Sequence, residues 1–145
     1  MLMKLIFSSL AVAAGVALAC QGATNQGLQK SAGIGPALII NTVVVLLGAV
    51  GLWLATGTKT TFFPAGASWT LYLGGVFGFT IIAAAVLVFP RLGAAYAIAL
   101  MVCGQCLAAM IIDRYGVMGM ETRPITLQRV IGMVLVAGGV AVFRI

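Results

Sequence analysis

The sequence predicts an all-α integral membrane protein with five transmembrane helices. The 145 residues are 63% hydrophobic and only 7% charged, a composition that would leave far too much apolar surface in water for a small soluble domain. The apolar residues gather in five stretches, each about long enough to cross a bilayer core of roughly 30 Å. Charged residues stand singly at the ends of these stretches. We therefore expect one membrane domain over residues 1–145, with the lipid bilayer as its surroundings.

The first helix is expected over residues 3–29. An alternative is a cleaved lipoprotein signal, because Lys4, an apolar run and the segment 17–20, which ends in Cys20, also fit that pattern. The polar residues that follow Cys20 continue at helical spacing, which favours a retained helix.

The other four helices are expected over residues 35–56, 68–89, 92–113 and 126–144. The second helix starts near Pro36, since proline is favoured at the first helical position. Pro90 and Arg91 are expected to form a very short turn before the fourth helix. The apolar part of the fifth helix, residues 127–143, lies at the lower limit for a membrane span.

The charges indicate membrane anchoring and leave the orientation open. Eight Lys and Arg against two Asp and Glu give a net charge of +6, but their isolated positions do not form a nucleic-acid-binding stripe. With the N-terminus on one side, that side collects Lys4, Lys59, Arg114, Arg123 and Arg129, and the other side collects Lys30, Arg91 and Arg144. This bias is small under the positive-inside rule. It fits either a single orientation or insertion in both orientations, which would allow antiparallel pairing.

Four amides within the predicted helices are the candidate substrate-binding residues, because hydrocarbon offers a polar side chain no hydrogen-bond partner. They are Gln21, Asn25, Asn41 and Gln105. Gln21 and Asn25 are four residues apart and share a helix face. The alternative is that these amides only join neighbouring helices, at about 0.6–2 kcal/mol each.

The remaining polar groups give little support for catalysis. Asp113 ends the fourth helix beside Arg114, so a local ion pair is the simplest expectation and an ion- or charge-dependent role the alternative. Cys103 and Cys106 have redox spacing, but in mid-helix and in hydrocarbon they are better explained as small packing residues. The sequence has no histidine and shows no nucleophile–base pair, metal cluster or cofactor loop. We expect no catalytic residue, no metal and no cofactor.

Gly132 and Gly139 lie seven residues apart on one face of the fifth helix. Small residues at such spacing let helix backbones approach closely, so this face is a candidate dimer interface. Packing within one chain is the alternative.

Several motifs together resemble the YdcZ-like family. They are Gln21-Gly22 followed by Asn25, the segment 89–95, Gly104-Gln105, Ile112-Asp113, Gly116, Gly119 and Arg123-Pro124. The resemblance implies a member of the drug/metabolite transporter superfamily in a bacterial inner membrane, with multi-pass topology in one or both orientations. It further implies the half-unit of a homodimer, or of a pair with a homologous subunit. It also favours a retained first helix.

The related small multidrug resistance transporters use a membrane-embedded glutamate in the first helix and a seven-spaced glycine pair in the last. This chain has the pair but offers only Gln21 and Asn25 in place of the glutamate, so proton-coupled export of cationic drugs does not carry over. We expect a transporter half-unit that works as an antiparallel dimer and moves a small polar solute of unknown identity by alternating access. The alternative is a non-transport assembly or regulatory subunit; an enzyme is the weakest class.

Overall fold

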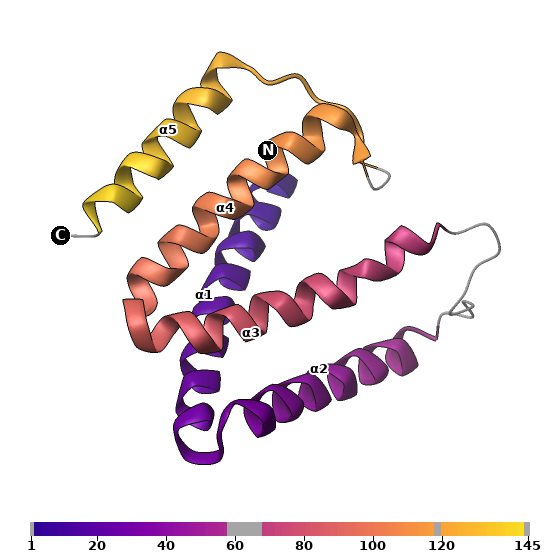
Figure 1. Cartoon of the computed structure of the whole chain (residues 1–145). Helices are drawn as coiled ribbons and strands as arrows, with labels where there is room; N and C mark the ends of the chain where they lie inside the picture. Colours follow the sequence, from indigo (N-terminus) through magenta and orange to yellow (C-terminus); the bar gives the residue numbers. More distant parts are fainter. Residues whose placement is uncertain (1, 58–67, 118–119, 144–145) are drawn as a thin grey trace. The chain divides into compact units, whose positions relative to one another are not determined.

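The computed structural model describes residues 2–57, 68–117 and 120–143, and these residues are helical apart from short connections (Figure 1). The helices are α1 (Leu2–Ala32), α2 (Ile34–Thr56), the 3-10 helix η1 (Trp69–Leu73), α3 (Gly74–Leu92), α4 (Ala94–Tyr115) and α5 (Leu127–Val142). The described part of the chain contains no strand. This confirms the all-α class that the apolar stretches predict.

The lengths of the helices fit a membrane protein. Four helical segments are long and apolar enough to span a bilayer: α1, α2, η1 together with α3, and α4. The fifth, α5, is apolar but has only 16 residues. At 1.5 Å per residue it measures about 24 Å, somewhat less than the hydrocarbon core.

The chain divides into two compact units, Met1–Pro90 and Arg91–Ile145, which we describe separately. The first contains α1, α2 and most of α3. Here α1 and α2 pack directly against each other as a hairpin that turns at Gly33, whose φ of +90° suits glycine. The buried side chains of this unit include Ala37 of α2 and Val86 and Phe89 of α3. The expectation of one domain over the whole chain stays a prediction.

The end of α3 differs from the expected turn at Pro90 and Arg91. Both residues lie inside α3, and the helix ends at Leu92. The fixed φ of proline is compatible with a helix, although its missing N–H removes one backbone hydrogen bond from the last turn. The chain instead turns at Gly93, which takes a φ of +77° and accepts a hydrogen bond from Ala97 N at 3.1 Å.

In the second unit α4 and α5 pack against each other. The α4 helix is capped by Gly116, whose N–H donates to the carbonyl of Ile112 at 2.8 Å. After the turn, Arg123 N donates to the carbonyl of Asp113 at 2.7 Å. Thr126 caps α5, its hydroxyl oxygen accepting a hydrogen bond from Arg129 N at 3.4 Å. These bonds hold the start of α5 close to the end of α4.

Candidate functional site

The α1 helix carries a row of amides on the face that meets α2. Gln21, Asn25 and Gln29 are spaced by four residues, which aligns them along one side of a helix. Asn25 is buried, with 6% of its surface exposed, and Gln21 and Gln29 are half-buried. The hairpin therefore buries polar side chains where α1 packs against α2.

Asn41 of α2 joins two of these amides. Its Oδ1 accepts one hydrogen bond from Gln21 Nε2 at 3.1 Å and another from Asn25 Nδ2 at 3.2 Å. Asn25 lies eight residues before Gly33 and Asn41 eight residues after it, so both sit about 12 Å from the turn at 1.5 Å per residue. We call Gln21, Asn25 and Asn41 the amide cluster. The structure brings together three of the four amides that the sequence singles out.

Two buried polar atoms of this hairpin, Asn41 Nδ2 and Gln29 Oε1, have no hydrogen-bond partner among the residues that the structure describes. Leaving a buried polar group unpaired costs about 1–3 kcal/mol. Gln29 is not among the candidates that the sequence gives, although it lies four residues after Asn25. It is the last residue of the expected first helix, where a polar side chain is ordinary.

The position of Gly22 shows why the Gln21-Gly22 motif has a glycine. It is buried, and the ring of Phe89 from α3 lies where a β-carbon at position 22 would stand. Phe89 is itself only 3% exposed. Two adjacent residues of α1 thus contact two different helices. Gln21 binds Asn41 of α2, and Gly22 leaves space for Phe89 of α3.

A cavity of about 270 Å³ lies between α2 and α3, which run alongside each other in the first unit (Figure 1). Asn41 forms part of its wall, together with Gly75, Gly78 and Phe79. The lining is mostly apolar, and Thr42, also in the wall, donates its hydroxyl to the carbonyl of Leu38 in its own helix. Asn41 is thus the residue that borders both the amide cluster and this cavity.

Gln105, the fourth candidate, belongs to the second unit. Its side chain is exposed and forms no hydrogen bond within the described part of the chain. It lies on a different face of α4 from Cys106 and Met110, which line a cavity against α5. Its membership in a common site with the amide cluster stays a prediction.

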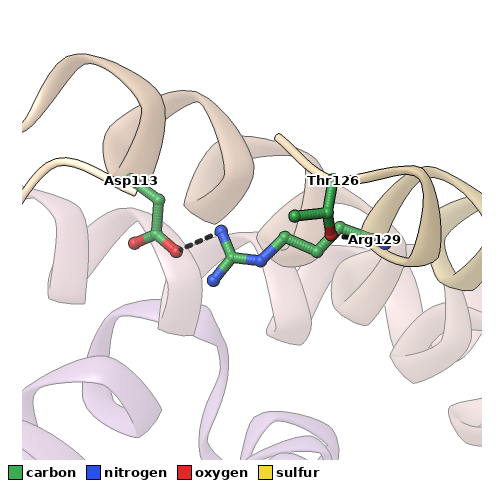
Figure 2. Close-up of polar contacts among 3 residues, drawn as sticks. All are labelled: Asp113, Thr126 and Arg129. Carbon is green, nitrogen blue, oxygen red and sulfur yellow. Dashed lines mark hydrogen bonds and ion pairs between the residues drawn. The ribbon is translucent and has the colours of Figure 1, made fainter. Parts of the chain in front are cut away.

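Asp113 pairs with Arg129 of α5 and not with its neighbour Arg114, so the expected local ion pair is wrong. Arg129 Nη1 lies 3.0 Å from Asp113 Oδ2, and Figure 2 shows the two side chains pointing toward each other. Consecutive residues point about 100° apart on a helix and do not face each other. The two side chains are 25% and 33% exposed, and they border a cavity of about 350 Å³ between α4 and α5. This ion pair joins the ends of two helices.

The expected dimer glycines lie on α5. Gly132 borders the cavity between α4 and α5, and a β-carbon at Gly132 or Gly139 would meet no atom within 4 Å. The glycines are thus not required for close packing within the described part of the chain. Their role in a dimer stays a prediction. Among the described residues there is no cluster of three His, Cys, Asp or Glu side chains suited to a metal ion.

Comparison with known proteins gives one match. A family model described as "Putative inner membrane exporter, YdcZ" matches residues 6–142, a range that begins in α1 and ends with α5. Neither the curated proteins nor the solved structures gave a match to this chain.

Proposed function

This chain belongs to the YdcZ family and is a multi-pass membrane transporter, and we propose that it moves a small polar solute across the inner membrane of a bacterium. The amide cluster supports this proposal. Three uncharged hydrogen-bonding side chains from two candidate membrane spans meet about 12 Å from the hairpin turn, and hydrocarbon would offer such groups no other partner. Such side chains can form hydrogen bonds in place of those that a solute makes with water, and they do not require the solute to be charged.

The bonds inside the cluster suit a reversible site. Gln21 and Asn25 both donate to the same oxygen of Asn41, so an entering solute exchanges neutral hydrogen bonds for similar ones. Exchange of this kind needs α1 and α2 to separate locally, which fits alternating access. In this proposal Gln21, Asn25 and Asn41 bind the solute, and Gln105 lines the path at the protein's second unit.

We propose that the working form is a dimer, most simply an antiparallel pair of this chain or a pair with a homologous subunit. The five-to-three distribution of basic residues supports insertion in both orientations. The short α5 supports a partner at this helix, since an apolar helix shorter than the bilayer core can be accommodated by oligomerisation. Gly132 and Gly139, with open space at their β-carbon positions, would form that contact.

The test is a comparison of exported metabolites. Cells expressing the wild-type chain, Gln21→Ala or Asn25→Ala are compared by untargeted mass spectrometry of medium and cytoplasm, with equal membrane levels verified by immunoblot. We expect at least one compound whose export depends on the wild-type chain and is lost in both variants. Gln26→Ala is the matched control on α1, since this half-buried amide lies outside the cluster. Unchanged export in both cluster variants contradicts the proposed site.

A second candidate function is a non-transport assembly or regulatory subunit. The observation that favours it is that Gln21, Asn25 and Asn41 bind one another, as amides do when they only join helices. In this case loss of the amides lowers helix association while the metabolite profile stays the same. A large loss of dimer stability in Gln105→Leu with export unchanged also favours this candidate.

A further inference from the structure

The two unpartnered atoms of the α1–α2 hairpin are of opposite kinds. Asn41 Nδ2 is a donor with two N–H groups, and Gln29 Oε1 is an acceptor. Gln29 lies one helical turn from Asn25, which binds Asn41. The same helix pair thus holds one unused donor and one unused acceptor, both enclosed.

The Asn41 amide cannot relieve this by turning over alone. Its Oδ1 accepts from Gln21 Nε2 and from Asn25 Nδ2. A half-turn of the side-chain amide would place its NH₂ group against both donors and break both hydrogen bonds. As long as Gln21 and Asn25 donate to it, the Asn41 oxygen faces α1 and the NH₂ group stays available for another partner.

We propose that Asn41 and Gln29 bind a neutral solute that carries both a hydrogen-bond acceptor and a hydrogen-bond donor, such as a carboxamide or a hydroxyl group. The acceptor of the solute meets Asn41 Nδ2, and its donor meets Gln29 Oε1. This inference rests on the proposed function and deepens it. Gln29 becomes a binding residue, and the solute is defined by its chemistry.

The absence of charge in the amide cluster and the size of the nearby cavity further restrict the chemical class of the solute. A carboxylate has no donor for Gln29, and an ammonium group has no acceptor for Asn41. Neither charge would be balanced, because the amide cluster contains no charged side chain. The cavity of about 270 Å³ beside Asn41 has room for a small apolar body and lies just below the roughly 300–1,000 Å³ of ordinary ligand pockets. Since the two atoms are enclosed in this structure, the solute reaches them when α1 and α2 separate.

Nuclear magnetic resonance of the purified full chain in lipid nanodiscs tests the proposal. The sequence has two asparagines, Asn25 and Asn41, so labelling asparagine with ¹⁵N yields two side-chain NH₂ groups, assigned with Asn25→Ala. Four probes of similar length are titrated: butyramide, pentan-2-one, butyrate and butylammonium. We expect butyramide to shift the Asn41 signals most. Pentan-2-one, which has an acceptor but no donor, should bind roughly 3- to 10-fold more weakly, as for one lost hydrogen bond.

A variant of Gln29 separates its role from general packing. Gln29→Met should weaken butyramide binding by roughly 3- to 10-fold and leave pentan-2-one binding unchanged, because the ketone has no donor to lose. Gln26→Met is the matched control and should change neither. The Asn25 signals report whether each variant keeps the hairpin. Equal weakening for both probes overturns the assignment of Gln29.

The outcomes separate this inference from the proposed function. Butyrate or butylammonium shifting the Asn41 signals as strongly as butyramide overturns the solute class, as does the absence of any shift. If export is lost in Gln21→Ala in that case, transport through the amide cluster still stands. Butyramide binding that depends on Gln29, together with unchanged export in Gln21→Ala, supports the binding chemistry and contradicts transport.

Discussion

The α1–α2 and α4–α5 junctions use different polar groups, and these groups lie at different distances from the chain turns. The α1–α2 junction is joined by the neutral amides of Gln21, Asn25 and Asn41, and the α4–α5 junction by the ion pair of Asp113 and Arg129. Asn41 lies about 12 Å from its turn at 1.5 Å per residue, whereas Arg129 is the third residue of α5 and Asp113 lies in the last turn of α4.

This difference follows from the cost of removing charge from water. A charged side chain near a helix end can stay hydrated at the headgroup level, and both members of the ion pair are a quarter to a third exposed. Deeper in the membrane a charge is expensive, and an amide loses less. The chain thus has its ion pair at the ends of two helices and its uncharged hydrogen bonds farther from a chain turn.

The largest effect is expected for Asn41→Leu. This change removes the common acceptor of Gln21 and Asn25 and leaves two donors unpaired, one of them on a residue only 6% exposed. We expect the free energy of unfolding to fall by about 2–4 kcal/mol, measured by denaturant titration in micelles. Thr42→Val is the control, since the Thr42 hydroxyl bonds only within its own helix. Equal losses in the two variants would show that the amide hydrogen bonds add nothing specific.

The next largest effect is expected where Gly22 of α1 meets the ring of Phe89 of α3. In Gly22→Ala the new methyl group overlaps the buried ring of Phe89, and we expect a loss of about 1–3 kcal/mol in unfolding free energy. Gly27→Ala is the control: its β-carbon meets no atom within 4 Å, so it should gain about 0.5–1 kcal/mol in helix propensity. Adding Phe89→Leu to Gly22→Ala should recover part of the loss. Simple additivity of the two changes would contradict the contact.

A smaller effect is expected at the ion pair. Asp113→Asn removes the charge that faces Arg129, and we expect a loss of about 0.5–1.5 kcal/mol, because the pair is partly exposed. This loss should shrink as salt is raised to 1 M, whereas the loss in Asn41→Leu should not change. Arg114→Gln is the control and should stay within about 0.5 kcal/mol of the wild type. A salt-independent loss in Asp113→Asn would remove the electrostatic distinction between the two junctions.

The smallest effect on folding is expected for Gln105→Leu. The side chain is exposed and without a hydrogen bond in the described part of the chain, so the unfolding free energy should change by less than about 0.5 kcal/mol. The measurement that matters is the dimer fraction in nanodiscs, counted by single-molecule photobleaching. An unchanged dimer with lost export places Gln105 on the solute path; a dissociated dimer places it at a subunit contact.

Hydropathy and helical period were enough to predict the all-helical class and nearly all of each helix. The exceptions lie at the ends: α3 continues through Pro90 and Arg91, and α5 begins and ends inside its expected range. For the candidate site, the four-residue spacing of Gln21 and Asn25 predicted their common face. The same spacing places Gln29 on this face too. Its burial could not be predicted, because it depends on how α2 packs against α1.

The sequence by itself determined that this chain lives in a membrane, since the length and apolarity of a span are local properties of consecutive residues. It also determined the positions at which uncharged polar side chains occur within the apolar stretches. Only the tertiary structure decided that Asn41 accepts from both Gln21 and Asn25, that Asp113 binds Arg129, and that Phe89 lies over Gly22. Each of these pairings depends on which faces of two helices meet, and that is set by side-chain packing between residues far apart in the chain.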